Sequence, residues 1–300
     1  MDDSTRLKVD AFLHLLLYPS LALTGVAAVG LRIRRGAPAP ERPGVLALSL
    51  AVALAGSWVG IVAFPALPPV DTRDYAPFFA LLVPLPFLVL ESRPRIGLVA
   101  PLAAVVLVLV TGLYLKPILG GEYAPHDRVA QGAALMLLVW LGVDRLATVV
   151  PTPSVLAAVC FASIGAAACA LLSGTAVVGQ ALGGVAAVTG LASLLTWRVP
   201  RLTMGRAGVA AVLVPFFGGL IYAHYYGDLP AAPAAIATLA PLSAAAALPL
   251  RRVVPATVLA GLRPSCPPAP PRSTPCTSPT RSTPPTPGRT AVLPPPTTAS

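Results

Sequence analysis

The histidines of this chain are the side chains best suited to metal binding or proton transfer. There are three of them: His14 lies near the N-terminus, His126 lies in GGEYAPHDRVAQG, and His224 lies in YAHYYGD. Carboxylates stand close to the last two, and imidazole together with carboxylate can bind a divalent metal or relay protons. The sequence therefore gives the hypothesis of one metal-binding polar site, made of Glu122, His126, Asp127, His224 and Asp228.

A plainer interpretation of the same residues is that loops are polar where they meet water. No HxxxH, HExxH or DxD spacing is present to favour the metal site. The cysteines add nothing to it, because Cys160 and Cys169 lie nine residues apart in an apolar run and no CxxC pair exists. Walker A and GxGxxG signatures are also absent, so the sequence assigns no cofactor.

The elements that must position these residues follow from the composition. Of 300 residues, 56% are hydrophobic and 11% are charged, whereas a soluble domain carries about 25% charged residues. So few charges cannot cover a surface that faces water. This excludes a soluble enzyme and a disulfide-rich secreted module, and it predicts an all-α, polytopic transmembrane helix bundle embedded in the lipid bilayer.

A helix crosses a bilayer in about 20 apolar residues, and on this criterion we predict about nine spans. Their ranges are 11–32, 44–64, 76–90, 96–116, 129–150, 154–173, 175–196, 208–227 and 231–250. The range 76–90 is short and contains Pro84 and Pro86, so a kinked or re-entrant segment is the alternative there.

The stretch 146–197 contains no charged residue. At about 1.5 Å per residue it exceeds one membrane thickness, so it must fold back on itself. Pro151 and Pro153 mark its entry, and Ser173-Gly174-Thr175 is the predicted hairpin turn.

The distribution of basic residues predicts the orientation of the spans, because cytoplasmic loops are enriched in Lys and Arg. With the N-terminus outside, the inner loops carry thirteen arginines, and the outer segments carry five basic residues. We therefore predict a multi-pass protein of the cell membrane with an outer N-terminus and a cytoplasmic C-terminus. All three histidines and eight of the eleven carboxylates then lie at the outer face. The net charge of +10 comes largely from the arginines of the inner loops, which set the orientation of the spans. No nucleic-acid partner is therefore expected.

The C-terminal residues differ in kind from the rest. Thirteen of the 37 residues in 264–300 are proline, and too few apolar residues are present to form a core. We predict a transmembrane domain over 1–262 and a disordered, Pro/Ser/Thr-rich tail over 263–300. Whether this tail is authentic or the product of a frameshift stays open.

Three prolines are expected to interrupt helices: Pro84 and Pro86 in VPLPF, and Pro215 in VPFFGG. Interrupted helices often line the substrate site of transporters. Asp144-Arg145 is the other polar feature of an apolar range. In a helix that runs to residue 150, both residues lie about two turns from its inner end, inside the hydrocarbon, where ionisable side chains usually face protein or water. We favour the alternative that the helix ends near Val143, so that both side chains reach the inner surface.

Small residues at Gly56-x-x-x-Gly60 and Gly179-x-x-x-Gly183 allow helices to approach closely, within the bundle or between subunits of an oligomer. The interrupted helices favour a carrier or channel for a neutral or small solute. One alternative is a membrane-embedded enzyme or assembly factor with the outer His/carboxylate site. A second is a structural or partner-binding membrane subunit without any site, so whether the protein is an enzyme stays open.

Overall fold

A computed structural model describes Gly25, Ala28 and residues 43–62, 74–92, 98–119, 121, 124–200 and 202–246. Within these ranges the structure is helical, and the β-structure consists of one isolated bridge between Leu119 and Ala124. The predicted all-α class is therefore confirmed for this part of the chain. The chain divides into two compact units, Met1–Val254 and Pro255–Ser300, and every helix named below belongs to the first.

The helices coincide with eight of the nine predicted ranges. They are α3 (Pro43–Val62), α4 (Tyr75–Leu82), α5 (Pro84–Ser92), α6 (Val99–Leu115), α7 (His126–Val149), α8 (Thr152–Leu172), α9 (Ala176–Arg198), α10 (Arg206–Tyr226), α11 (Ala231–Leu239) and the 3-10 helix η4 (Ala240–Ala246). The predicted span 11–32 lies outside the described residues apart from Gly25 and Ala28, both helical, and the predicted tail 263–300 lies outside them entirely.

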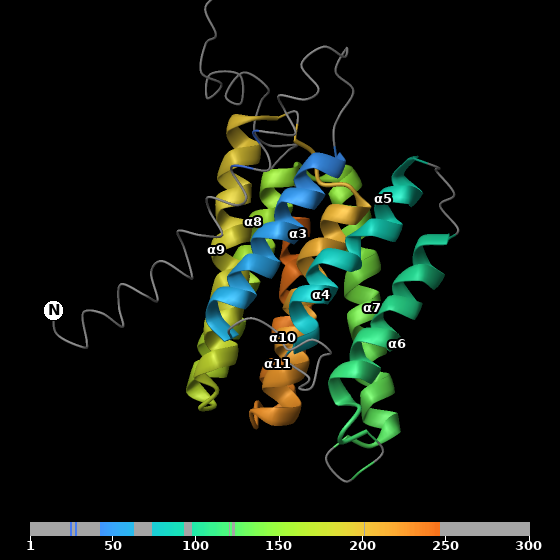
Figure 1. Ribbon diagram of the computed structural model, residues 1–300, viewed down its shortest axis with the longest axis vertical. Helices are drawn as coiled ribbons and strands as arrows, with labels where there is room; N and C mark the ends of the chain where they lie inside the picture. Colours follow the sequence, from blue (N-terminus) through green and yellow to red (C-terminus); the bar gives the residue numbers. More distant parts are fainter. Residues whose placement is uncertain are drawn as a thin grey trace, which may run out of the picture. The chain divides into compact units, whose positions relative to one another are not determined.

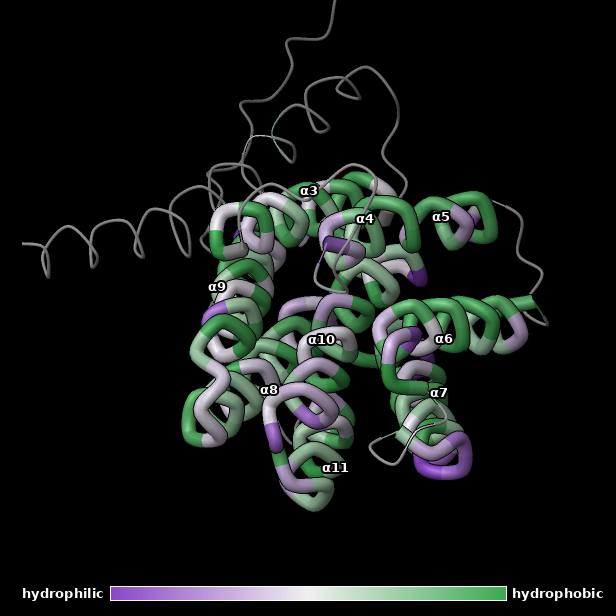
Figure 2. Tube along the Cα trace, turned by 60° about the horizontal axis from the view of Figure 1, so that its bottom comes forward, coloured by the Kyte–Doolittle hydropathy of each residue, from purple (hydrophilic) through white to green (hydrophobic). Residues whose placement is uncertain are grey.

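Five of these helices are long and apolar enough to cross a bilayer: α3, α7, α8, α9 and α10. Three shorter apolar stretches, Tyr75–Glu91, Val99–Leu115 and Ala231–Ala246, occupy the remaining predicted ranges. In Figure 2 hydrophobic residues follow the helices, and strongly hydrophilic residues lie near helix ends, for example at one end of α7. This distribution fits a protein whose helices lie in a lipid bilayer.

Helix α10 is the centre of the bundle (Figure 1). It contacts each of the other α-helices from α3 to α11, and sixteen of its 21 residues are buried. Its sequence explains this position, because it is apolar on all sides between Ala207 and Ala223 and carries Gly218-Gly219, which admit close neighbours.

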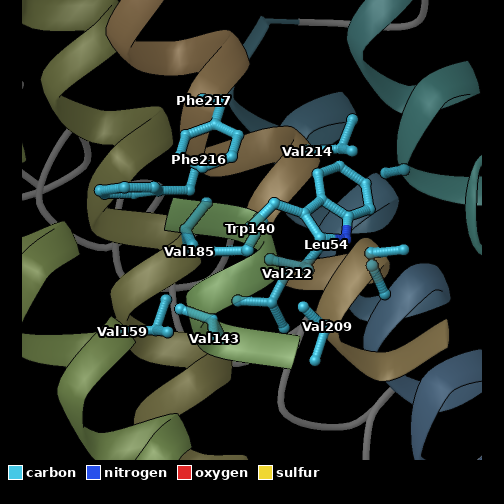
Figure 3. Close-up of a cluster of buried hydrophobic side chains, with 14 of the residues drawn as sticks. Leu54, Trp140, Val143, Val159, Val185, Val209, Val212, Val214, Phe216 and Phe217 are labelled. Atoms are coloured by element: carbon cyan, nitrogen blue, oxygen red, sulfur yellow. The ribbon is translucent and has the colours of Figure 1, made fainter. Parts of the chain in front are cut away.

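Large apolar side chains fill the middle of the bundle around α10. Figure 3 shows Trp140 of α7 among valines of several helices, near Phe216 and Phe217 of α10. Trp140 is fully buried, and its ring centroid lies 5.4 Å from that of Phe87 on α5. Aromatic rings at this separation add attraction beyond their buried area, so this cluster joins α5, α7 and α10.

The uncharged stretch forms the α8–α9 hairpin, as predicted, and no other pair of described helices makes more extensive contact. Gly174 has a positive φ of 88°, a conformation that glycine adopts without strain. Its N–H donates to Leu171 O, and the Thr175 N–H donates to Ala170 O at 3.0 Å. This Schellman closure satisfies the last carbonyls of α8, and it confirms the turn predicted at Ser173-Gly174-Thr175.

Candidate functional site at the two ends of helix α10

The residues of the predicted metal site lie at the N-terminus of α7 and at the C-terminus of α10. His126 and Asp127 open α7 and are exposed, His224 lies in the last turn of α10 and is half-buried, and Asp228 follows it and is exposed. The two ends belong to helices that contact each other in the bundle.

This contact does not bring the predicted ligands together among the described residues. In that part of the chain no three His, Cys, Asp or Glu side chains form a group that could hold a metal ion. Glu122 lies outside the described residues. The five-residue site therefore stays a prediction. Among its described residues, His224 is the one for which a hydrogen-bond partner is found.

His224 is held in place by the backbone that follows α10. Its Nδ1 lies 2.6 Å from Leu229 O. A backbone carbonyl only accepts hydrogen bonds, so Nδ1 carries the proton, and Nε2 of the neutral ring keeps a lone pair for a proton or a ligand. Asp228 makes the turn possible with a φ of 51°, since aspartate tolerates the left-handed region better than most residues.

Tyrosines surround the same end of α10, and the sequence analysis did not single them out. The Tyr226 hydroxyl donates to Tyr114 O of α6 at 2.8 Å, and the ring of Tyr226 stacks on that of Tyr222 with centroids 4.8 Å apart. Tyr114 continues the aromatic contact to Phe79 of α4 at 5.7 Å. Aromatic and hydrogen-bonding contacts thus fix the C-terminal end of α10 to α4 and α6.

A charged cluster lies at the opposite, N-terminal end of α10. Glu91 of α5 accepts a hydrogen bond from the Ala207 N–H through Oε1 at 2.8 Å. The first N–H groups of a helix have no partner within the helix, so this carboxylate caps α10 from a neighbouring helix. Negative charge is also favourable there because of the helix dipole.

Asp144 of α7 completes this cluster. Its Oδ2 lies 4.0 Å from Nε of Arg206, the first residue of α10. The expectation that the helix ends near Val143 was wrong, because α7 continues to Val149. Asp144 therefore lies within the helix, beside the opposite charge of Arg206 on another helix, a partner that no spacing within α7 reveals. Arg145 next to it is exposed.

The three prolines behave differently from one another. The helix of 75–92 is divided at Val83, where α4 ends and Pro84 begins α5, and Pro86 lies within the first turn of α5. The expected interruption at Pro215 is absent, because α10 continues through this residue from Arg206 to Tyr226. Tight packing on all sides holds α10 together there, although proline removes one helical hydrogen bond.

Buried side-chain donors without a partner are a further feature of the described helices. They are the Oγ atoms of Ser57 and Ser163, Oγ1 of Thr111 and Nε1 of Trp58. Other buried hydroxyls bond to their own helix, as Thr189 does to Val185 O and Thr196 to Ala192 O. An unpaired polar atom in an apolar interior costs about 1–3 kcal/mol, so a hydrogen-bonding partner would stabilise each of these four side chains.

Comparisons with protein-family models, with curated proteins and with solved structures found no match to this chain. The functional argument therefore depends on the geometry described above.

Proposed function

We propose that this protein is a multi-pass carrier or channel for a small neutral solute. The observation that carries the proposal is the set of buried donors without a partner in α3, α6 and α8. A neutral solute with hydroxyl or amide groups would satisfy such donors inside a membrane without bringing a charge there.

The distribution of charge supports a neutral solute. The described ionisable side chains at α10 lie near its ends, as Arg206 and His224 do, and the residues between them are apolar. Carriers driven by protons or ions usually place ionisable side chains at membrane depth. The division of the helix at Val83 adds support, because interrupted helices are frequent beside transport sites.

Osmotic flux into proteoliposomes tests this function. The purified protein is reconstituted, and uptake of glycerol, erythritol and urea is followed by light scattering against empty liposomes. We expect faster uptake of at least one of these solutes. Uptake equal to that of empty liposomes for all of them would contradict the proposal.

Isosteric variants connect the flux to the unpartnered hydroxyls. Thr111→Val and Ser163→Ala should lower the flux about two- to tenfold, the factor expected for one lost hydrogen bond. Thr196→Val is the matched control, because its hydroxyl already bonds to Ala192 O. Equal flux in all three variants would remove these hydroxyls from the solute path.

Topology is part of the same proposal. Nine spans, with the N-terminus outside and the C-terminus in the cytoplasm, account for the distribution of arginines. The high proline content after residue 262 supports a disordered tail. Reporter fusions after residues 36, 70, 124, 175, 203 and 229 test the sidedness. They should report the inside at residues 36 and 203 and the outside at residues 70, 124, 175 and 229.

A membrane-embedded enzyme is the second candidate, and the orientation of His224 favours it. Hydrogen bonding of one ring nitrogen to a carbonyl is the usual way in which a metal-ligating or base histidine is oriented. Zn²⁺ titration by calorimetry separates the two functions. Binding that His224→Ala and His126→Ala both abolish would favour the enzyme.

A further inference from the structure

One face of α3 has no neighbour among the described residues. Helix α3 packs on α4, α9 and α10, and Ser57 and Ile61 approach Gly184 of α9. Five residues that are not buried lie at intervals of three and four, on one helix face: Val45, Leu48, Val52, Gly56 and Val59. Gly44, Gly60 and Ile61 are also not buried.

Gly56 leaves this stripe without a side chain near its middle. It is exposed, and a Cβ atom placed on it would meet nothing within 4 Å. Gly60 lies one turn further on and is also not buried. Gly179, the first residue of the other small-residue motif, is occupied within the bundle, since Leu171 of α8 packs against it. The α3 stripe is therefore a helix-docking face without a helix in the described part of the chain.

The chain before α3 contains a segment of the right length and location to occupy the stripe. Residues 11–32 are 22 predominantly apolar residues, which as a helix extend about 33 Å. Ten residues, 33–42, separate them from Pro43. Helices joined by a short connection usually lie antiparallel as neighbours, and the faces of α3 toward α4, α9 and α10 are taken.

Residues 11–32 and α3 can be aligned antiparallel, with the arginine-rich connection between them at one end of the helix pair. Antiparallel alignment of Arg32 with Gly44 sets Ala28 opposite Leu48 and Thr24 opposite Val52. The same alignment sets Leu16 opposite Gly60. Leu48 then meets Ala28 and Leu16 meets Gly60, which is how membrane helices pack closely, and Gly56 meets Ser20.

We propose that residues 11–32 dock as an antiparallel helix on the α3 stripe, with Thr24 and Ala28 against Val52 and Leu48, and with Ser20 and Leu16 over Gly56 and Gly60. Gly25 and Ala28 are helical and exposed, and Gly25 has nothing within 4 Å of its Cβ position, so these small residues are available for the contact. This inference does not depend on the carried solute.

Cysteine cross-linking of the full chain in membranes tests the docking. The four native cysteines are replaced by alanine, a protease site is inserted after Gly36, and Thr24→Cys is combined with Val52→Cys. After oxidation and cleavage, the N-terminal fragment should remain attached to the rest of the chain. Thr24→Cys with Gly165→Cys is the matched control, because Gly165 of α8 is also exposed and open, and this pair should release the fragment.

The other outcomes overturn the proposal. A cross-linked dimer of uncleaved chains would assign the stripe to a second copy of the protein, and absence of any cross-link would assign it to lipid. Ala28→Cys with Leu48→Cys repeats the test one turn away, so that a single poorly folding variant does not decide the result.

Discussion

Helices α7 and α10 are similar in length and hydropathy, but α10 lies at the centre of the bundle and α7 at its edge. Both are apolar and long enough to cross a bilayer. Sixteen of 21 residues are buried in α10, but only five of 24 are buried in α7. Hydropathy therefore identifies a span without telling whether lipid or protein surrounds it, because a lipid tail and a leucine side chain are equally apolar.

The five buried residues of α7 nevertheless lie on one stripe: Met136, Val139, Trp140, Val143 and Leu146. An edge helix thus joins the core through a single line of side chains, whereas a central helix does so with its whole surface. Substitutions should accordingly be most costly along that stripe of α7, and at most positions between Ala207 and Ala223 of α10.

Truncation of Trp140 should have the largest effect on the free energy of unfolding. It separates the buried stripe of α7 from the exposed side of the same helix. Trp140 is fully buried against Phe87, whereas Leu138 of the same helix is 67% exposed. Trp140→Ala should lower the free energy of unfolding by about 3–5 kcal/mol, since it leaves a large cavity. Leu138→Ala should lower it by less than about 0.5 kcal/mol. Unfolding by SDS in mixed micelles measures both; similar losses would show that α7 is buried on both sides.

Replacement of one glycine by valine in each helix compares α10 and α7 directly. A Cβ on Gly218 of α10 would lie 2.9 Å from the hydroxyl of Tyr114, which is itself buried. A Cβ on Gly132 of α7 would meet nothing within 4 Å. Gly218→Val should therefore cost about 1–3 kcal/mol through overpacking, and Gly132→Val should be close to neutral. Thermal unfolding in detergent checks this, and a destabilised Gly132→Val with an intact Gly218→Val would break the comparison.

Removal of the carboxylate that caps α10 should have the next effect. Glu91→Ala leaves the Ala207 N–H without its acceptor, which should cost about 1–2 kcal/mol, as for the loss of a helix cap. Glu91→Gln retains an oxygen and should preserve most of the stability. The exposed Arg145 supplies the control, since Arg145→Gln should leave the unfolding midpoint unchanged. Equal stability of Glu91→Ala and the native protein would argue against the cap.

The ion pair between α7 and α10 should contribute least. Asp144 and Arg206 are 4.0 Å apart and about one-fifth exposed, so their coupling should stay below about 1 kcal/mol. A double-mutant cycle with Asp144→Asn and Arg206→Gln measures it. A coupling of several kcal/mol would mean that the pair is desolvated and that α7 is held by charge as much as by Trp140.

Periodicity and length located the helices in the sequence, because each helix satisfies its own backbone hydrogen bonds and needs only an apolar surface. The α8–α9 turn could be predicted because the uncharged stretch is too long for one crossing and Gly174 permits the required φ. The ion pair between Asp144 of α7 and Arg206 could not, because the partner lies 62 positions further along the chain.

The candidate site shows the same division. His224 was recognisable from its residue type, but its orientation depends on Leu229 O and on the turn at Asp228. The unpartnered donors were not recognisable at all. Serine and threonine hydroxyls in a membrane helix usually bond to their own backbone, and only the packing around Thr111 and Ser163 leaves them without a partner.

For this protein, the sequence alone determined the membrane class, the helix ranges and the turn between α8 and α9. These properties depend on how many apolar residues follow one another and on local backbone preferences. The tertiary structure decided that α10 is central, that α7 is peripheral and that Glu91 caps α10. Those relations depend on which side chains fit together across the bundle, and helices of equal hydropathy carry no signal of their neighbours.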